Sequence, residues 1–211
     1  PADEEAAPYA SVYALHALLE AQQRGAAAPP DMLERGGAWL AAFAAGNDGG
    51  LARERSRAYA IYVMTRQSRV ASNLANAELE RLDAQFGKRW RSDITAAWLA
   101  AAYQSMRQAA PARELIAGVR FSDPARPWAP AAAGEPDGYA YTANVHDAQL
   151  AFLLARHFPE RLRDAAPAAL TALTTQPRAG HSSASAAWTV LALDAWAAAA
   201  ETAGAPPALS I

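Results

Sequence analysis

The sequence predicts an all-α fold, a partial α/α toroid of stacked helical hairpins with about nine or ten helices. Three observations support this: one helical pattern recurs along the chain, turn signals separate its copies, and no stretch alternates like a β-strand. The clearest copy spans residues 9–25, where Val12, Leu15, Leu18 and Leu19 recur at helical spacing and mark one apolar face. It ends in an arginine and a glycine, which suit a helix C-terminus.

The pattern returns in four further copies, over residues 56–69, 94–108, 144–158 and 183–200. The copies lie about 40 to 50 residues apart, which suits one helix out and one helix back per unit. An alanine-rich helical chain can show such echoes by chance, but the turn signals between the copies favour a true repeat. The positions that align across the copies are Tyr13, Tyr59, Trp98, Gln149 and Trp188.

Return helices are expected between the copies, over residues 30–45, 72–86, 111–119 and 159–174. They carry more charge than the copies, so the copies should form an inner ring that the return helices shield from water. In the second return helix, the charged residues off the apolar face are predicted to face solvent. They are Glu78, Glu80, Arg81 and Asp83.

The predicted organisation is a lead-in over residues 1–8, a single α/α-toroid domain over 9–204 and a tail over 205–211. Five hairpins do not close the usual ring of six, and the chain begins with Pro1 instead of methionine. We therefore expect a fragment of a larger protein whose toroid continues upstream.

Composition narrows the function further. A net charge of −2 and a pI near 6.1 argue against a nucleic-acid partner. The chain has no cysteine, which excludes disulfides, thiolate zinc sites, a cysteine nucleophile and a thioester built from this chain. The four histidines lack metal-ligand spacing, and no phosphate-binding loop occurs. We predict no catalytic residue, no cofactor site and no metal site.

Four stretches carry a family resemblance. They read YALHALLEAQQRG over 13–25, RAYAIYVM over 57–64, DAQLAFLLARHFPERL over 147–162 and SSASAAWTVLALD over 182–194. In this order and spacing, they resemble helices of the thioester-bearing domain of bacterial alpha-2-macroglobulins. The resemblance extends from residue 9 to about residue 200, nearly the whole chain.

This resemblance implies an α/α-toroid domain of a large periplasmic protein, often lipid-anchored to the inner membrane. Such proteins trap proteases: cleavage of a bait region triggers a conformational change, and in many members a thioester then captures the protease. The family's Cys-X-Glu-Gln motif is absent here because the chain has no cysteine. Either the motif lies upstream of Pro1, or this branch has lost it; both remain open.

On this basis the chain is predicted to be a non-catalytic domain of a bacterial defence protein with endopeptidase inhibitor activity. Its expected partners are neighbouring domains of the parent protein and, through the parent, target proteases. Contact with a membrane is expected only through an anchor elsewhere in the parent.

Two other functions are considered. An α/α-toroid enzyme, such as a glycosidase or a terpenoid cyclase, needs paired carboxylates or an Asp-rich cluster, and only Asp93, Asp147 and Asp194 lie on the predicted inner helices. A helical-repeat adaptor would instead bind a partner protein on a concave face.

The histidines and serines look structural. His146 and Asp147 are adjacent on a helix, so they point apart and form no dyad; Asp147 suits the helix dipole. His181 beside two serines suggests an activated hydroxyl, but Ser182 or Ser183 is predicted to cap the last helix. His16 is assigned to the core or rim, with a place near a thioester of the whole protein as the alternative. His157 is predicted to cap carbonyls at a helix end.

The tryptophans could line a sugar cleft, but their helical spacing places most of them in the core. They are Trp39, Trp90, Trp98, Trp128, Trp188 and Trp196. Arg53, Arg55 and Arg57 form a short basic run, which Glu54 interrupts and which is predicted to be a solvated face.

Overall fold

The computed structural model describes residues 8–123, 141–174 and 182–202, and all regular structure within these ranges is helical. This confirms the predicted all-α class. The chain divides into two compact units, residues 1–118 and 119–211, and each is described here by itself. The closed or partial toroid, and the single domain over 9–204, stay predictions.

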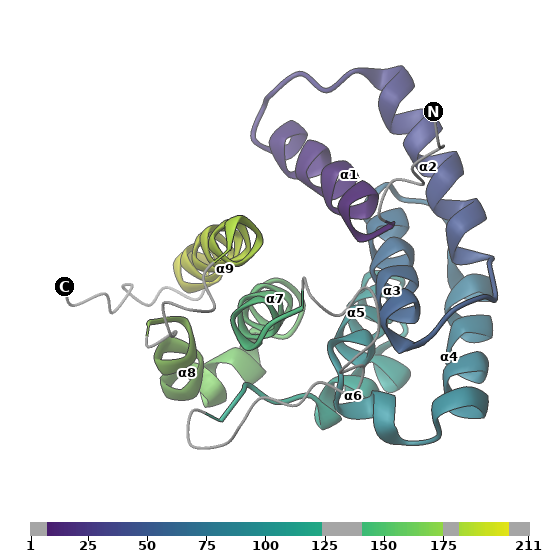
Figure 1. The fold of residues 1–211 in the computed structure, drawn as a ribbon. Coiled ribbons are helices and arrows are strands. Elements are labelled where there is room, and N and C mark those ends of the chain that lie inside the picture. The colour runs from purple at the N-terminus through teal and green to yellow at the C-terminus, as the bar shows by residue number, and fades with distance from the viewer. Residues whose placement is uncertain (1–7, 124–140, 175–181, 203–211) are drawn as a thin grey trace. The chain divides into compact units, whose positions relative to one another are not determined.

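The described residues 8–118 of the first unit form six α-helices, with a short 3-10 turn before the fifth (Figure 1). The helices follow the predicted hairpin order, and their ends lie within a few residues of the expected positions. They are α1 (Pro8–Gln23), α2 (Pro30–Ala44), α3 (Leu51–Arg66), α4 (Ser72–Phe86), η1 (Arg89–Ser92), α5 (Ile94–Ser105) and α6 (Ala109–Gly118).

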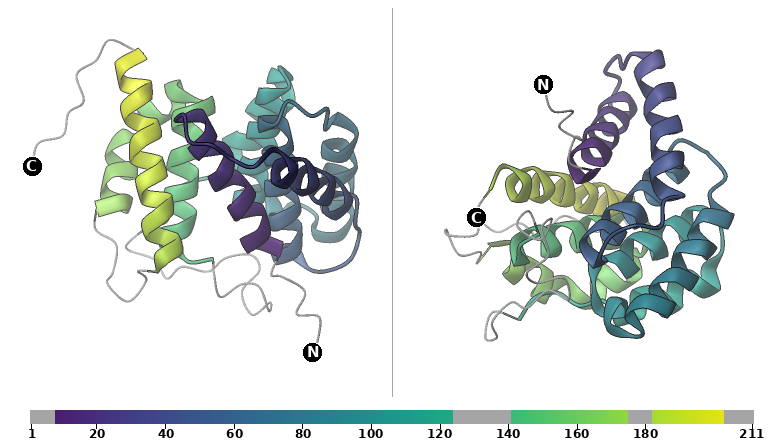
Figure 2. Two further views of the ribbon diagram at one scale, coloured as in Figure 1. Left: turned by 90° about the horizontal axis from the view of Figure 1, so that it is seen from above. Right: turned by 45° about the vertical axis from the view of Figure 1, so that its right-hand side comes forward.

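Helices α3 and α5 form the centre of this unit, where they pack against each other along most of their length. Helices α1, α2 and α4 pack on α3, and α6 packs on α5 (Figures 1 and 2). Every residue from Ile94 to Tyr103 is buried, which the alanine-rich sequence of α5 allows. The inner position predicted for these two copies is therefore observed within the unit.

Aromatic rings fill the space between α3 and α5. Trp98 stacks on Tyr59 with ring centroids 4.3 Å apart and lies 5.1 Å from the ring of Tyr62. All three side chains are almost fully buried. Because large aromatic residues bury the most apolar area per side chain, this stack is a principal source of packing energy in the unit.

Two glycines shape the surroundings of α2. A Cβ atom at Gly36 would lie 2.1 Å from Cδ2 of Leu15, so this residue allows α1 and α2 to approach closely. Gly49 adopts a φ of +106°, a conformation that other residues rarely adopt, in the turn that leads into α3.

The second unit contains α7 (Ala143–His157), α8 (Pro159–Thr174) and α9 (Ser183–Thr202). Helix α7 packs against both of the others and is buried from Asn144 to Ala155 (Figure 2). Phe152 of α7 meets Trp188 of α9 edge to face, with ring centroids 5.6 Å apart. Within the described ranges, no helix is both long and apolar enough to cross a bilayer.

The aromatic stack leads to a first prediction. We expect Trp98→Ala to lower the free energy of unfolding by about 3–5 kcal/mol, because it removes a fully buried ring and leaves a cavity. Urea denaturation followed by circular dichroism measures this change. Val70→Ala, at a position that is 89% exposed, is the control and should change stability by less than about 0.5 kcal/mol. Equal effects of the two substitutions would show that the stack is not a stabilising core.

Candidate functional site

The side chains of Glu54, Arg57, Glu78 and Arg81 meet between α3 and α4, and we call them the buried charge cluster. Nη1 of Arg57 donates to Oε1 of Glu54 over 2.7 Å. Arg81 lies with Nε 3.3 Å from Oε2 of Glu54 and pairs through Nη2 with Glu78. Glu54, Arg57 and Glu78 have no exposed area. Two carboxyl groups and two guanidinium groups therefore share one desolvated space.

The cluster also holds the end of α2. Nε of Arg57 donates to the carbonyl oxygen of Phe43 over 3.3 Å, and Nη1 of Arg81 donates to that of Gly46 over 2.7 Å. Cations at a helix C-terminus face the negative end of its dipole, so these contacts are favourable. The cluster thus ties together α2, α3 and α4.

These positions correct two predictions. Arg55 and Arg57 are buried and Arg53 is largely covered, so the basic run is not a solvated face. Glu78 is also buried instead of facing solvent on α4. The physical reason is that α3 lies at the centre of its unit, where its charges are buried together with opposite charges.

Glu78 carries an unusual protonation equilibrium. Burial, followed by the nearby charge of Glu54, raises the pKa of Glu78 to about 8, although Arg81 acts in the opposite direction. A carboxyl group with this pKa is mostly protonated at neutral pH. The protonated form of Glu78 is favoured because two carboxyl groups lie in one buried site.

A second buried ion pair joins α3 to the start of α5. Nε and Nη2 of Arg55 donate to the two carboxylate oxygens of Asp93 over 3.1 and 2.7 Å. Asp93 also caps α5, because its Oδ1 accepts from the backbone N–H of Thr95 over 3.0 Å. Burial would raise the pKa of Asp93, but the Arg55 guanidinium and the Thr95 hydrogen bonds lower it below its usual value.

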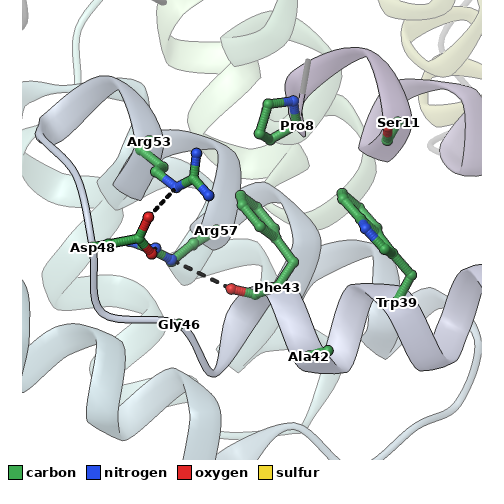
Figure 3. A pocket seen from close by; sticks show the side chains of 9 residues that line it. All are labelled: Pro8, Ser11, Trp39, Ala42, Phe43, Gly46, Asp48, Arg53 and Arg57. Carbon is green, nitrogen blue, oxygen red and sulfur yellow. Dashed lines mark hydrogen bonds and ion pairs between the residues drawn. The ribbon is translucent and has the colours of Figure 1, made fainter. Parts of the chain in front are cut away.

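A pocket of about 270 Å³ lies where α1, α2 and α3 meet, and we call it the α1–α2–α3 pocket (Figure 3). The rings of Trp39 and Phe43 stand nearly parallel on its α2 side, with centroids 5.1 Å apart. The guanidinium carbons of Arg53 and Arg57 each lie 5.5 Å from the centroid of Phe43. The described residues that line it are Pro8, Ser11, Trp39, Ala42, Phe43, Gly46, Asp48, Arg53 and Arg57.

Asp48 closes the charged end of this pocket. Its carboxylate pairs with Nη2 of Arg57 and lies 3.2 Å from Nε of Arg53. A hydrogen bond to the backbone of its own residue, together with the two arginines, lowers the pKa of Asp48 despite the opposing effect of burial. Its side chain is 68% exposed, whereas that of Arg57 has no exposed area. The buried charge cluster and the pocket therefore share Arg57.

His16 lies in the core of the first unit, in agreement with its assignment. Its Nδ1 is 2.8 Å from the hydroxyl oxygen of Tyr59, and its Nε2 is 3.3 Å from Oε1 of Glu20. Burial raises the pKa of Tyr59 well above its usual value, so the hydroxyl stays protonated and can donate to Nδ1. Arg24 and Arg66 each approach Glu20 to 3.2 Å. The group links α1 to α3.

His146 and Asp147 do not form a dyad. Nε2 of His146 donates to the carbonyl oxygen of Arg120 over 2.7 Å, and its Nδ1 accepts from the hydroxyl of Tyr141. Asp147 accepts from the backbone N–H and the hydroxyl of Ser122, the former over 2.7 Å. Both residues are buried and bind the chain segment before α7 to the beginning of this helix.

Of the two serines predicted as the cap of α9, Ser182 is the one that caps it. Its Oγ accepts from the backbone N–H of Ser185 over 3.1 Å, and its own N–H donates to Oγ of Ser185 over 2.8 Å. His181 lies outside the described residues. His157 is the last residue of α7 and stacks edge to face on Phe158. Its predicted role as a carbonyl cap stays a prediction.

The tryptophans within the described residues do not line one sugar cleft. Trp90, Trp98 and Trp188 are fully buried, and Trp39 is the one described tryptophan that contributes to the α1–α2–α3 pocket. Trp128 lies outside the described residues. Trp196 is half-buried on α9.

The three carboxylates considered for an enzyme have separate roles. Asp93 is held by Arg55, Asp147 is held by Ser122, and Asp194 is exposed. Within the described part of the chain, no three potential ligands gather to hold a metal ion. These findings do not favour the glycosidase or cyclase alternative.

Comparison with known proteins gives relatives of one kind. The chain is 28% identical over 195 residues to an alpha-2-macroglobulin of Rickettsia conorii, and 29% identical over 209 residues to one of Pasteurella multocida. An alpha-2-macroglobulin homolog of Yersinia pestis is 28% identical over 201 residues. The chain is similar to bacterial alpha-2-macroglobulins. The resemblance to this family noted in the sequence is thereby confirmed, whereas its assignment to the thioester-bearing domain stays a prediction.

The matches cover 90–92% of this chain but only 9–10% of each alpha-2-macroglobulin. The chain thus spans about a tenth of the length of these relatives. No known family model and no solved structure matches it significantly. The matched segment has no cysteine, so it does not itself contain a Cys-X-Glu-Gln motif.

Sequence reasoning missed the acidic members of the site. The burial of Glu54 and Glu78 was not predicted, and Asp48 was not singled out. A usable signal was present, because each glutamate precedes an arginine by three residues and can pair with it on the same helix face: Glu54 with Arg57, and Glu78 with Arg81.

The Arg55–Asp93 pair provides a second prediction. We expect Arg55→Ala to cost about 3–5 kcal/mol of folding free energy, because it leaves Asp93 buried without its cation. Arg35→Ala, which breaks the exposed pair with Asp31, should cost no more than about 1 kcal/mol. Urea titrations of the two variants test the difference, and a comparable small loss in both would contradict a stabilising buried pair.

Glu78 provides a third prediction, on pH. Its pKa is raised from 4.5 to about 8 in the folded state, so the stability it contributes is complete below pH 4.5 and is lost as the pH rises through about 8. Glu78→Gln keeps the neutral form, and we expect it to flatten the dependence of the urea midpoint on pH between about 5 and 8. Glu80→Gln, at an exposed position of the same helix, should keep the wild-type slope. A wild-type midpoint that rises over this interval would refute the assignment.

Proposed function

We propose that this chain is a non-catalytic helical segment of a bacterial protease-trapping protein of the alpha-2-macroglobulin kind. The observation that carries the proposal is the similarity to three bacterial alpha-2-macroglobulins over about nine-tenths of the chain. The whole protein would inhibit endopeptidases in bacterial defence, and this segment would belong to its thioester domain. The periplasm is the proposed location, with any membrane anchor elsewhere in the parent.

The polar groups of the described residues support a structural role. The buried charge cluster, the Arg55–Asp93 pair and the His16 group each link different helices. Such ties make the helices of the first unit move as one body, because breaking any of them leaves a buried charge without its partner. A segment of this kind suits a protein in which bait cleavage repositions preformed domains.

The proposal also specifies what the parent must supply. A thioester requires a cysteine from outside this chain, so its chemistry would come from a Cys-X-Glu-Gln motif elsewhere in the parent. The contribution of the present segment would be to pack around that group and exclude water from it. A parent without the motif would trap proteases through the conformational change alone.

The fourth prediction concerns the full-length protein. After incubation with a protease, we expect one dominant cleavage, a change in hydrodynamic size and loss of protease activity toward large protein substrates. Methylamine treatment followed by intact-mass measurement distinguishes a parent protein with a thioester from one without it. An intact thioester gains one methylamine adduct and releases one thiol. The isolated 211-residue chain is the control and should leave the protease fully active. A full-length protein that neither slows digestion nor changes size would reject protease trapping.

A further inference from the structure

We propose that the α1–α2–α3 pocket binds the C-terminal residue of a peptide when that residue carries an aromatic side chain. The pocket combines a carboxylate receptor at one end with an aromatic wall at the other (Figure 3). The proposal concerns this chain's own binding site and does not depend on protease trapping.

The size of the pocket favours a single residue. Its volume of about 270 Å³ lies just below the range of roughly 300–1,000 Å³ that drug-sized ligands occupy. A ligand this small must carry its ring and its carboxylate on the same residue to reach both ends. Among peptide groups, a C-terminal aromatic residue meets this requirement, whereas an internal one needs a second residue to supply the charge.

The charged end already holds a carboxylate. Asp48 forms ion pairs with the guanidinium groups of Arg53 and Arg57. Its own side chain is exposed and lies in the turn between Gly46 and Gly49. Arg57 is fixed independently by Glu54 and by the carbonyl of Phe43, so it stays in place when Asp48 moves away. A ligand carboxylate can therefore replace Asp48 without changing the charge of the site.

The aromatic end offers an exposed ring surface. Trp39 is 36% exposed, although its ring stacks on Phe43, and Pro8 lies on the opposite side of the pocket (Figure 3). A ligand ring placed beside Trp39 gains an aromatic contact worth about 0.5–1.5 kcal/mol beyond its buried area, which corresponds to about two- to twelve-fold in affinity. This contact distinguishes an aromatic residue from an aliphatic one.

The test uses N-acetyl-phenylalanine as the probe and the 211-residue chain as the receptor. We expect the indole N–H resonance of Trp39, assigned with Trp39→Phe, to shift with a dissociation constant on the order of 1 mM. N-acetyl-phenylalanine amide lacks the carboxylate, and N-acetyl-alanine lacks the ring. Both should bind at least about five-fold more weakly, because each loses one of the two contacts.

Two substitutions, each with a matched control, test the charged end. Arg53→Gln should weaken binding at least about five-fold, since it removes a charge-assisted hydrogen bond. Asp48→Asn should strengthen it about two- to five-fold, because it removes the competing carboxylate of an exposed pair. Arg35→Gln and Asp31→Asn alter an exposed ion pair elsewhere on α2 and should leave the dissociation constant unchanged.

Several outcomes would overturn the proposal. They are equal binding of the acid and its amide, an equal effect of Arg35→Gln and Arg53→Gln, or weaker binding by Asp48→Asn. Tighter binding of N-acetyl-aspartyl-phenylalanine amide than of N-acetyl-phenylalanine would reject the terminal carboxylate as the recognised group. Circular dichroism verifies that each variant is folded, and the ligand comparisons on the unchanged chain decide the question if a variant is not.

Discussion

The burial of charge on α3 is the constraint on which the first unit depends. This helix lies at the centre of its unit, yet it carries Arg55, Glu54 and Arg57 in buried positions. A desolvated charge is tolerated only when an opposite charge and hydrogen bonds compensate for it. Each neighbouring element therefore has to supply an opposite charge. This requirement restricts α4, α5 and the α2–α3 turn to positions in which their charged side chains reach α3.

This constraint acts differently from apolar packing. Apolar burial is roughly proportional to the area removed from water and has no preferred direction, so on its own it limits a small shift of α5 along α3 less sharply than a directional contact does. The bidentate Arg55–Asp93 pair allows no such shift, since its two hydrogen bonds fix both distance and angle. We therefore attribute the register of α3 against α5 to the ion pair and the bulk of the packing energy to rings such as Trp98.

Much of the fold follows from the sequence, but the site does not. Apolar spacing in α1 and the turn signals after α2 and α4 place the helices to within a few residues, because these signals are local. The burial of Arg57 and Glu78 is a tertiary property, and hydropathy assigns such residues to the surface. The wrong prediction for the basic run has this cause. Its charges were assigned to a solvated face of α3, whereas neighbouring helices cover that face with residues of opposite charge.

The α1–α2–α3 pocket escaped prediction for a related reason. Its residues come from α1, α2 and α3, and none of its side chains belongs to a motif that can be recognised in one stretch. Trp39 looked like a core residue because it has helical spacing, but α2 lies at the edge of the unit and leaves the ring partly exposed. Only the packing of three helices shows that this ring and the two guanidinium groups share one space.

The pocket and the buried charge cluster form one electrostatic unit through Arg57. Arg57 pairs on its buried side with Glu54 and on its outer side with Asp48. Asp48 also lies beside Arg53, so an anion at this position meets two guanidinium groups and remains in contact with water. The interior therefore maintains an anion-binding position at the surface, and the glycine-rich turn that carries Asp48 makes this position exchangeable. A buried network that serves the fold thus produces, as a physical consequence, a receptor for one external carboxylate.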